Sequence, residues 1–271
     1  MKTRILAAAV LLPLLLIVVL VLPKICTAVL FGLMAALAAY ELMQGTKLVT
    51  NPRLTVYAMV FAFLVPLWGF FGQVYVWALV GVLAFVALLY MELLLSKGKL
   101  PYAYVAISFA AGILIPYLFT AIVRIFATEK GIYLIFIPFV LAMVSDTGAY
   151  FAGRFFGKHK LAPVVSPNKT VEGVIGGVAA TILAMVIYCL TMQLSFGFAA
   201  NYLYALIYGL VGSLAAVFGD LCFSVIKRQT DIKDYGDLIP GHGGILDRFD
   251  SMMVVGPLAE VFLLLIPVVT K

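Results

Sequence analysis

Apolar runs long enough to cross a lipid bilayer follow one another along almost the whole chain, and this repetition limits the fold more than any other feature. Hydrocarbon about 30 Å thick is crossed by roughly 20 residues of α-helix. With 65% hydrophobic and 11% charged residues, the chain has too few polar side chains to cover a water-soluble fold of 271 residues. The sequence therefore predicts an all-α, polytopic integral membrane protein.

Counting these runs predicts about nine transmembrane helices. The first run follows Lys2 and Arg4, as in a signal peptide, but it lacks a small-residue cleavage site, so we expect a retained helix. The predicted spans are Ile5–Leu22, Ile25–Met43, Leu54–Phe71, Val74–Leu95, Pro101–Val123, Ile132–Phe151, Val174–Leu194, Tyr202–Ile226 and Ser251–Thr270.

Lysine and arginine are distributed unevenly between the two ends of these spans. If the N-terminus is cytoplasmic, 14 of the 18 basic residues fall on the cytoplasmic side and 4 on the other. The positive-inside rule then predicts a multi-pass protein of the cytoplasmic (inner) membrane, with its N-terminus and its polar segments in the cytoplasm. Topology and attraction to anionic membrane lipid explain the net charge of +6, so no nucleic-acid partner is predicted.

All seven aspartates lie in the second half of the chain, Asp146 alone and the other six between Asp220 and Asp250. We therefore expect an N-terminal transmembrane bundle, residues 1–125, and a C-terminal catalytic half, residues 126–271. A charged side chain in a membrane helix costs about 2.5–3.5 kcal/mol if it faces lipid, so such residues mark functional sites.

The predicted eighth span places Asp220, Ser224 and Lys227 on one helical face, because they are four and then three residues apart. This face should point into the protein. A structural ion pair between Asp220 and a lysine of a neighbouring helix is an alternative. Asp146, in the glycine-rich string VSDTGAYFAGRFFG, would share a cation with Asp220; a proton relay in a transporter is the competing explanation.

Ser166 and Pro167 form a helix-start signal, with serine as the N-cap and proline in the first turn. Lys169 and Thr170 would then lie in that first turn. Free backbone N–H groups there favour a phosphate, so this segment is a candidate phosphate-binding site.

The last polar loop reads PGHGG followed by LDRFD. Its glycines allow backbone N–H groups to form an anion-binding nest. Asp247 and Asp250 are three residues apart, and they point to one side if this segment opens the ninth helix. Hard oxygen ligands without a histidine and cysteine set favour magnesium over zinc. His242 alone is more typical of a loop hydrogen bond than of a catalytic base.

Carboxylates for a divalent cation beside clustered lysine and arginine are what nucleotidyl or phosphoryl transfer needs. Here the string SVIKRQTDIKDYGDLIPGHGGILDRFD, residues 224–250, resembles the signature of the phosphatidate cytidylyltransferase (CDP-diacylglycerol synthase) family. SPNKTVEG, residues 166–173, resembles a second segment of these enzymes. The signature positions are Ser224, Lys227, Arg228, Lys233, Asp234, His242, Gly243, Gly244, Asp247, Arg248 and Asp250.

The resemblance implies a magnesium-dependent transferase of phospholipid synthesis that converts CTP and phosphatidate to CDP-diacylglycerol and pyrophosphate at the cytoplasmic membrane face. Asp220 and Asp247 are the expected Mg²⁺ ligands, and a second cation is left open. The expected catalytic residues are Asp220, Asp247, Lys227, Arg248, Asp146 and Asp250. The expected substrate-binding residues are Lys169, Thr170, Ser224, Arg228, Lys233, Asp234, His242, Gly243 and Gly244.

Two other functions remain as alternatives at this stage. A transporter of an anionic solute would use charges at the membrane midplane, but it predicts an internal repeat, which the sequence does not show. Another metal-dependent lipid phosphotransferase, of the CDP-alcohol type, should carry a DG-xx-AR motif, which is absent. The small residues Gly32, Ala36 and Ala39 could pair two copies in a homodimer, although packing within one chain is the favoured use.

Overall fold

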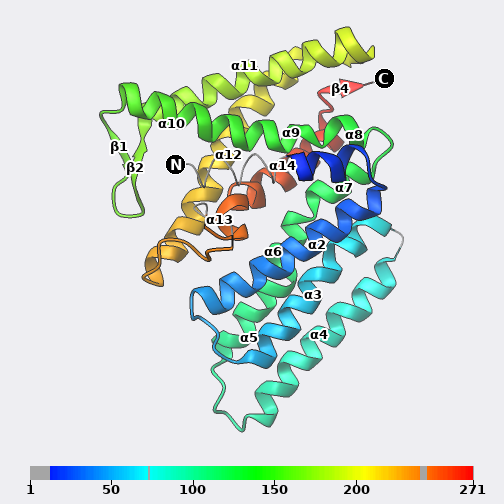
Figure 1. Cartoon of the computed structure of the whole chain (residues 1–271), viewed down its shortest axis with the longest axis vertical. Coiled ribbons are helices and arrows are strands. Elements are labelled where there is room, and N and C mark those ends of the chain that lie inside the picture. The colour runs from blue at the N-terminus through cyan, green and yellow to red at the C-terminus, as the bar shows by residue number, and fades with distance from the viewer. Residues whose placement is uncertain (1–12, 73, 239–242, 271) are drawn as a thin grey trace. The chain divides into compact units, whose positions relative to one another are not determined.

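The computed structural model describes residues 13–72, 74–238 and 243–270, and helices dominate them (Figure 1). Seven helices in this described part are long and apolar enough to cross a membrane, which confirms the all-α, polytopic architecture. They are Lys24–Gly45, Pro52–Phe71, Tyr75–Leu95, Tyr102–Ala127, Gly131–Phe156, Val171–Phe196 and Tyr202–Gln229.

The predicted count of nine is not confirmed. Residues 5–12 of the predicted span Ile5–Leu22 lie outside the described residues, so this span is not tested as a whole. The predicted ninth span is represented by α14 (Met252–Leu265), whose 14 residues are fewer than the roughly 20 that cross the hydrocarbon. Proline disfavours a helical conformation in the residue before it, and Ile266, which precedes Pro267, has left the helix with φ −137°. The chain then forms β4 (Val269–Thr270), antiparallel to β3 (Ala199–Ala200).

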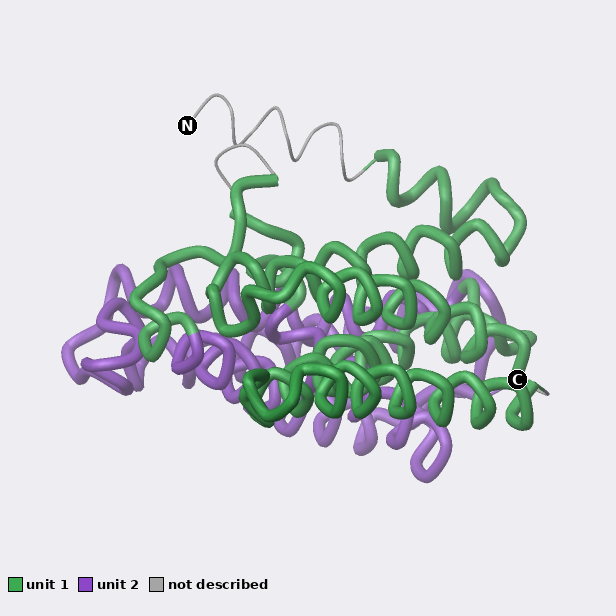
Figure 2. The backbone as a smooth tube through the Cα atoms, turned by 90° about the horizontal axis from the view of Figure 1, so that it is seen from below, with its two compact units in different colours: residues 1–132, 227–249 green, residues 133–226, 250–271 purple. Residues whose placement is uncertain are grey.

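The polypeptide forms two compact units (Figure 2). Unit 1 contains Met1–Ile132 and Lys227–Phe249, and unit 2 contains Tyr133–Ile226 and Asp250–Lys271. The predicted placing of the chemistry in residues 126–271 stays a prediction, whereas the fold itself groups the signature segment Lys227–Phe249 with the N-terminal helices.

Unit 1 is a helical bundle in which α2 packs along α3. A Cβ on Gly32 would lie 2.7 Å from the carbonyl oxygen of Phe63, so the small residue allows close packing within the chain. A homodimer stays a prediction. The elements are α2 (Lys24–Tyr40), the π-helical turn η1 (Glu41–Gly45), α3 (Pro52–Phe71), α4 (Tyr75–Leu95), α5 (Tyr102–Phe109), the π-helical turn η2 (Ala110–Leu114), α6 (Ile115–Phe119), α7 (Ala121–Ala127) and α13 (Ile245–Phe249).

Unit 2 is built on α10 and α11, which run side by side in Figure 1 and form its most extensive helix contact. A buried hydrogen bond of 2.7 Å joins the hydroxyls of Ser145 on α10 and Ser213 on α12. The elements are α8 (Gly131–Leu134, at the boundary), α9 (Phe136–Phe139), the π-helical turn η3 (Val140–Val144), α10 (Ser145–Phe156), β1 (Lys160–Ala162), β2 (Ser166–Thr170), α11 (Val171–Phe196), β3, α12 (Tyr202–Gln229), α14 and β4; the end of α12 belongs to unit 1.

Candidate active site

A cavity of about 480 Å³ lies within unit 2, among α10, β2, α11 and α12. This volume falls within the range of sites for small molecules. Its wall includes four of the predicted site residues, which three separate segments of the chain contribute: Asp146, Lys169, Thr170 and Asp220. The residues that the sequence assigned to a phosphate-binding segment and to two membrane helices therefore meet at one cavity.

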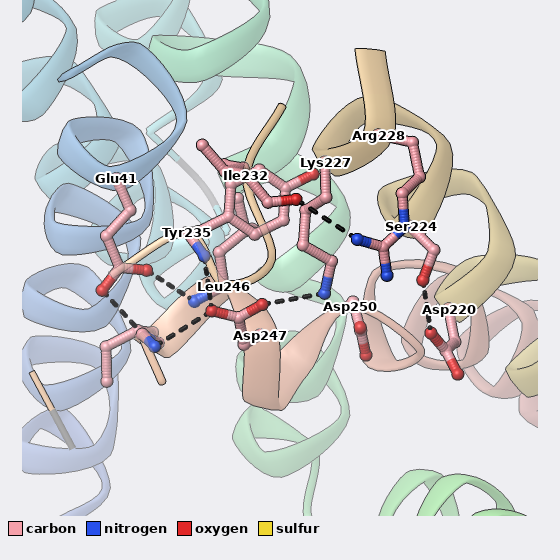
Figure 3. Close-up of polar contacts among 12 residues, drawn as sticks. Glu41, Asp220, Ser224, Lys227, Arg228, Ile232, Tyr235, Leu246, Asp247 and Asp250 are labelled. Atoms are coloured by element: carbon pink, nitrogen blue, oxygen red, sulfur yellow. Dashed lines mark hydrogen bonds and ion pairs between the residues drawn. The ribbon is translucent and has the colours of Figure 1, made fainter. Parts of the chain in front are cut away.

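Asp220 has two polar partners at this wall, one for each carboxylate oxygen. One carboxylate oxygen accepts a hydrogen bond of 3.1 Å from the Ser224 hydroxyl, one turn along α12, as Figure 3 shows. The other oxygen lies 2.6 Å from the ammonium nitrogen of Lys169. Both residues line the cavity and their side chains remain 20% and 26% exposed, although the Lys169 ammonium nitrogen itself is shielded from solvent. Asp220 therefore forms an ion pair with a lysine, as the structural alternative expected, but this lysine lies on the strand β2 and not on a neighbouring helix.

Lys169 and Thr170 reach the cavity by a route that the sequence did not predict. The expectation that Ser166 caps a helix is wrong: β2 runs from Ser166 to Thr170 and pairs with β1 as an antiparallel hairpin. Thr170 is the N-cap of α11, and its hydroxyl accepts a hydrogen bond of 3.1 Å from the amide of Gly173. An N-cap threonine commonly accepts a hydrogen bond from the amide three residues later, which has no partner within the helix. Thr170, and not Ser166, therefore caps this helix.

Sequence reasoning missed three cavity residues that have polar side-chain groups, Tyr150, Arg154 and Asn168. Arg154 donates a 2.9 Å hydrogen bond to the Tyr150 hydroxyl. The sequence contained a signal for Tyr150 and Arg154, because they follow Asp146 at intervals of four residues and so share its face of α10.

Asp247 lies in a second polar cluster, which belongs to unit 1 (Figure 3). One of its oxygens is 2.8 Å from the Lys227 ammonium nitrogen. The other accepts hydrogen bonds from the backbone amides of Tyr235, at 2.7 Å, and Gly244, at 3.0 Å. The side chains of Lys227 and Asp247 are only 11% and 2% exposed, so this is a buried ion pair in which both carboxylate oxygens of Asp247 accept hydrogen bonds.

Glu41 is the other carboxylate of this cluster, and sequence reasoning missed it. Its two oxygens accept hydrogen bonds of 2.9 Å and 2.8 Å from the amides of Ile245 and Leu246. The predicted anion nest therefore exists in part, but the chain's own carboxylates occupy its amides. A signal was available, because Glu41 falls inside the predicted apolar span Ile25–Met43, where a carboxylate needs partners.

The remaining signature residues are placed as follows. Lys233, Asp234 and Arg248 are exposed, and Arg228 makes a 3.5 Å contact with the carbonyl of Ile232. Gly243 has φ +83°, which favours glycine. His242 lies outside the described residues.

Asp247 and Asp250 were expected to point to one side if their segment opens the ninth helix, and this condition is not met, because α13 ends at Phe249 and α14 begins at Met252. Asp250 therefore lies in the connection between two helices, with one side-chain oxygen 2.7 Å from the amide of Ser251. Its carbonyl lies against Gly219, the residue before Asp220, where a Cβ would be only 3.0 Å away.

The described residues contain no group of three or more carboxylate, histidine or cysteine side chains that could hold a metal ion without other ligands. The donors that line the cavity are hard oxygen atoms of Asp146, Asp220, Thr170 and Asn168. Mg²⁺ is ordinarily held by one or two carboxylates together with substrate phosphates and water. This donor set fits that manner of binding.

These features define a polytopic membrane protein with a charged cavity suited to a phosphorylated ligand. Residues 2–266 match the model of the cytidylyltransferase family. The phosphatidate cytidylyltransferase of Bacillus subtilis (strain 168) is 37% identical over 238 residues, which cover 86% of this chain and 87% of the relative. Those of Staphylococcus epidermidis and Staphylococcus aureus (strain COL) are 45% and 44% identical over 136 residues, 50% of this chain and 51% of each relative. The chain belongs to the cytidylyltransferase family, which confirms the resemblance seen in its signature.

Removing the buried partner of Asp247 should destabilise the protein. Lys227→Met leaves an unpaired buried carboxylate, which costs about 3–5 kcal/mol. We expect a marked fall in the thermal unfolding temperature of the detergent-purified protein, and partial recovery when Asp247→Asn removes the charge as well. Lys233→Met, at an exposed position, is the control. A Lys227→Met protein as stable as this control would contradict the pairing.

Proposed function

We propose that this chain transfers the cytidylyl group of CTP to phosphatidate, giving CDP-diacylglycerol and pyrophosphate in phospholipid synthesis. The observation that carries this proposal is the 37% identity, over 86% of the chain, to an enzyme named phosphatidate cytidylyltransferase. The signature residues 224–250 and the charged cavity of unit 2 support the same chemistry.

The proposed reaction does not need a strong general base, because its nucleophile is an anion. An oxygen of the phosphatidate phosphate forms a bond to the α-phosphorus of CTP, and the bond from that phosphorus to the bridging oxygen of the β-phosphate breaks. The electron pair leaves with pyrophosphate. A phosphate monoester is already an anion at neutral pH, so positioning and charge neutralisation must supply the rate enhancement.

The cations at the cavity are suited to that task. The Lys169 ammonium and the Arg154 guanidinium belong to residues of its wall and can neutralise the charges of a triphosphate and a lipid phosphate. Thr170 and Asn168 add neutral hydrogen-bonding groups beside them. We assign substrate binding first to Lys169 and Thr170, as the sequence predicts, and add Arg154.

Mg²⁺ is the cofactor that we propose for this reaction, with Asp220 as its main protein ligand and Asp146 beside it. When bound, the ion would neutralise charge on the phosphates and orient them. Asp247 stays a predicted ligand, but its two oxygens already accept hydrogen bonds from Lys227 and two amides, so it would have to exchange one of these donors. A second cation also stays a prediction.

A multi-pass membrane protein suits a lipid substrate. Large apolar side chains on α4, such as Trp77 and Leu94, are exposed and can face acyl chains. CTP is made and used in the cytoplasm, so the positive-inside bias supports a cytoplasmic opening of the site and a cytoplasmic N-terminus. No feature of the described residues favours the alternatives, a transporter or a CDP-alcohol phosphotransferase.

The proposed reaction predicts that the purified protein releases pyrophosphate from CTP only when phosphatidate and magnesium are both present. Coupled pyrophosphate assays and recovery of CDP-diacylglycerol would measure this. Equal rates with ATP, or transport of an anion without turnover of CTP, would overturn the proposed function.

The magnesium proposal predicts that Asp220→Asn lowers kcat by at least a hundredfold, because the amide keeps the shape but loses the charge that holds the cation and Lys169. The protein should still insert and purify. The matched control is Asp231→Asn, an exposed position with φ +55°, which asparagine tolerates. A normal rate for Asp220→Asn at saturating magnesium would remove Asp220 from the proposed site.

The proposed orientation predicts that cysteines placed at Lys158 and Asp237, both exposed, react with an impermeant thiol reagent only from the cytoplasmic side. The background should lack the native Cys26, Cys189 and Cys222. A position in an established periplasmic or external loop of another membrane protein serves as the labelling control. Reaction from the outside at either site would contradict the proposed orientation, because cytoplasmic CTP could then not reach the site.

A further inference from the structure

Glu41 is a buried carboxylate for which the family signature has no position. It lies in the π-helical turn η1, at the end of the membrane helix that begins with α2. The residue is only 5% exposed. Single π-helical turns within α-helices occur often at functional sites. A carboxylate in such surroundings persists only if donors compensate the loss of water.

The donors of Glu41 are the first amides of α13, from Ile245 and Leu246. The first N–H groups of a helix have no partner within the helix, so they need an acceptor from elsewhere. The two carboxylate oxygens of Glu41 are the acceptors for these two amides, although Glu41 precedes Ile245 by 204 residues in the chain. The amide of Gly244 completes the set by donating to Asp247, three residues later, as in a capping box.

Close packing confirms that this contact is specific. A Cβ on Gly244 would collide with Glu41 Oε2, and a Cβ on Gly45 would collide with the carbonyl oxygen of Tyr235. The signature glycine at 244 is therefore required by the approach of Glu41, whatever the loop binds. Phe249, at the end of α13, packs edge-on against Phe119 of the same unit with ring centroids 5.1 Å apart.

The position of α13 determines where two signature side chains lie. Asp247 follows the two amides that Glu41 holds, and it in turn holds the Lys227 ammonium at 2.8 Å. Lys227 also lies over the ring of Tyr235, 5.4 Å from its centroid. Hydrogen bonds thus connect Glu41 to Lys227 through α13 and Asp247 (Figure 3).

We infer that Glu41 is a positioning residue for the cytidylyl transfer, which acts by fixing the first turn of α13 and so the placement of Asp247 and Lys227. This inference rests on the proposed function. Glu41 does not contact substrate in this role. A displacement of about 1 Å in a catalytic group can cost roughly a hundredfold in rate, so a loosened α13 should lower kcat more than it alters substrate binding.

The test compares Glu41→Gln with wild type in two measurements on the full chain. Glutamine offers one oxygen where two amides need acceptors, so one hydrogen bond is lost while the volume is kept. We expect kcat to fall at least tenfold, with KM for CTP and for phosphatidate changing less than threefold. We also expect faster backbone hydrogen exchange, by mass spectrometry, in residues 243–249 alone.

Two further variants make the comparison specific. Glu41→Asp keeps the charge and both oxygens on a shorter stem, and it should recover part of kcat and of the exchange protection. Glu92→Gln is the matched control, because Glu92 is also a largely shielded carboxylate of unit 1, where it accepts a hydrogen bond from Tyr57 and pairs with Arg53. It should leave kcat and the exchange of residues 243–249 unchanged.

The two measurements separate the possible failures. An inactive wild type overturns the proposed function, while hydrogen exchange still decides whether Glu41 holds α13. Unchanged exchange or unchanged kcat in Glu41→Gln overturns the positioning role. Faster exchange throughout both units also overturns it, because Glu41 would then support folding in general.

Discussion

The cost of placing a carboxylate among apolar helices is the constraint on which the polar part of this structure depends. Asp220, Asp247 and Glu41 are each compensated by a different set of donors. Asp220 has an ammonium and a hydroxyl, Asp247 has an ammonium and two amides, and Glu41 has two amides. Asp247 has three donors, and Asp220 and Glu41 have two each, so every carboxylate oxygen of the three has at least one donor, as expected if desolvation must be offset locally.

The features that could be predicted from the sequence are those with local causes. Long apolar runs fix where membrane helices form, because backbone groups in hydrocarbon must bond within their own segment. The shared face of Asp220 and Ser224 follows from helical periodicity, and α12 confirms it with a direct hydrogen bond. The family assignment was also available, because its signature is nearly continuous in the chain.

The features that were missed depend on distant contacts or on competing local signals. Ser166 and Pro167 are compatible with a helix start, but the pairing of β1 with β2 and the better cap at Thr170 move that start to Val171. Glu41 meets its amide partners across more than 200 residues, and no periodicity reports such a contact. Pro267 shortens α14 although the apolar composition continues beyond it.

The internal ion pairs also bear on how an enzyme of this kind handles highly charged substrates. A cation buried among apolar helices has a high desolvation free energy if it has no partner before the triphosphate binds. Pairing with an aspartate lowers this free energy. The side chains of Lys169 and Asp220 are partly exposed at the cavity, but the Lys169 ammonium nitrogen is itself shielded, so a phosphate that binds it must take the place of Asp220. Lys227 and Asp247 are sealed, and their pairing is held by amides that Glu41 helps to fix. The Lys169–Asp220 pair at the cavity is therefore suited to contact the substrate phosphates. The buried Lys227–Asp247 pair is suited to hold the signature segment in one conformation.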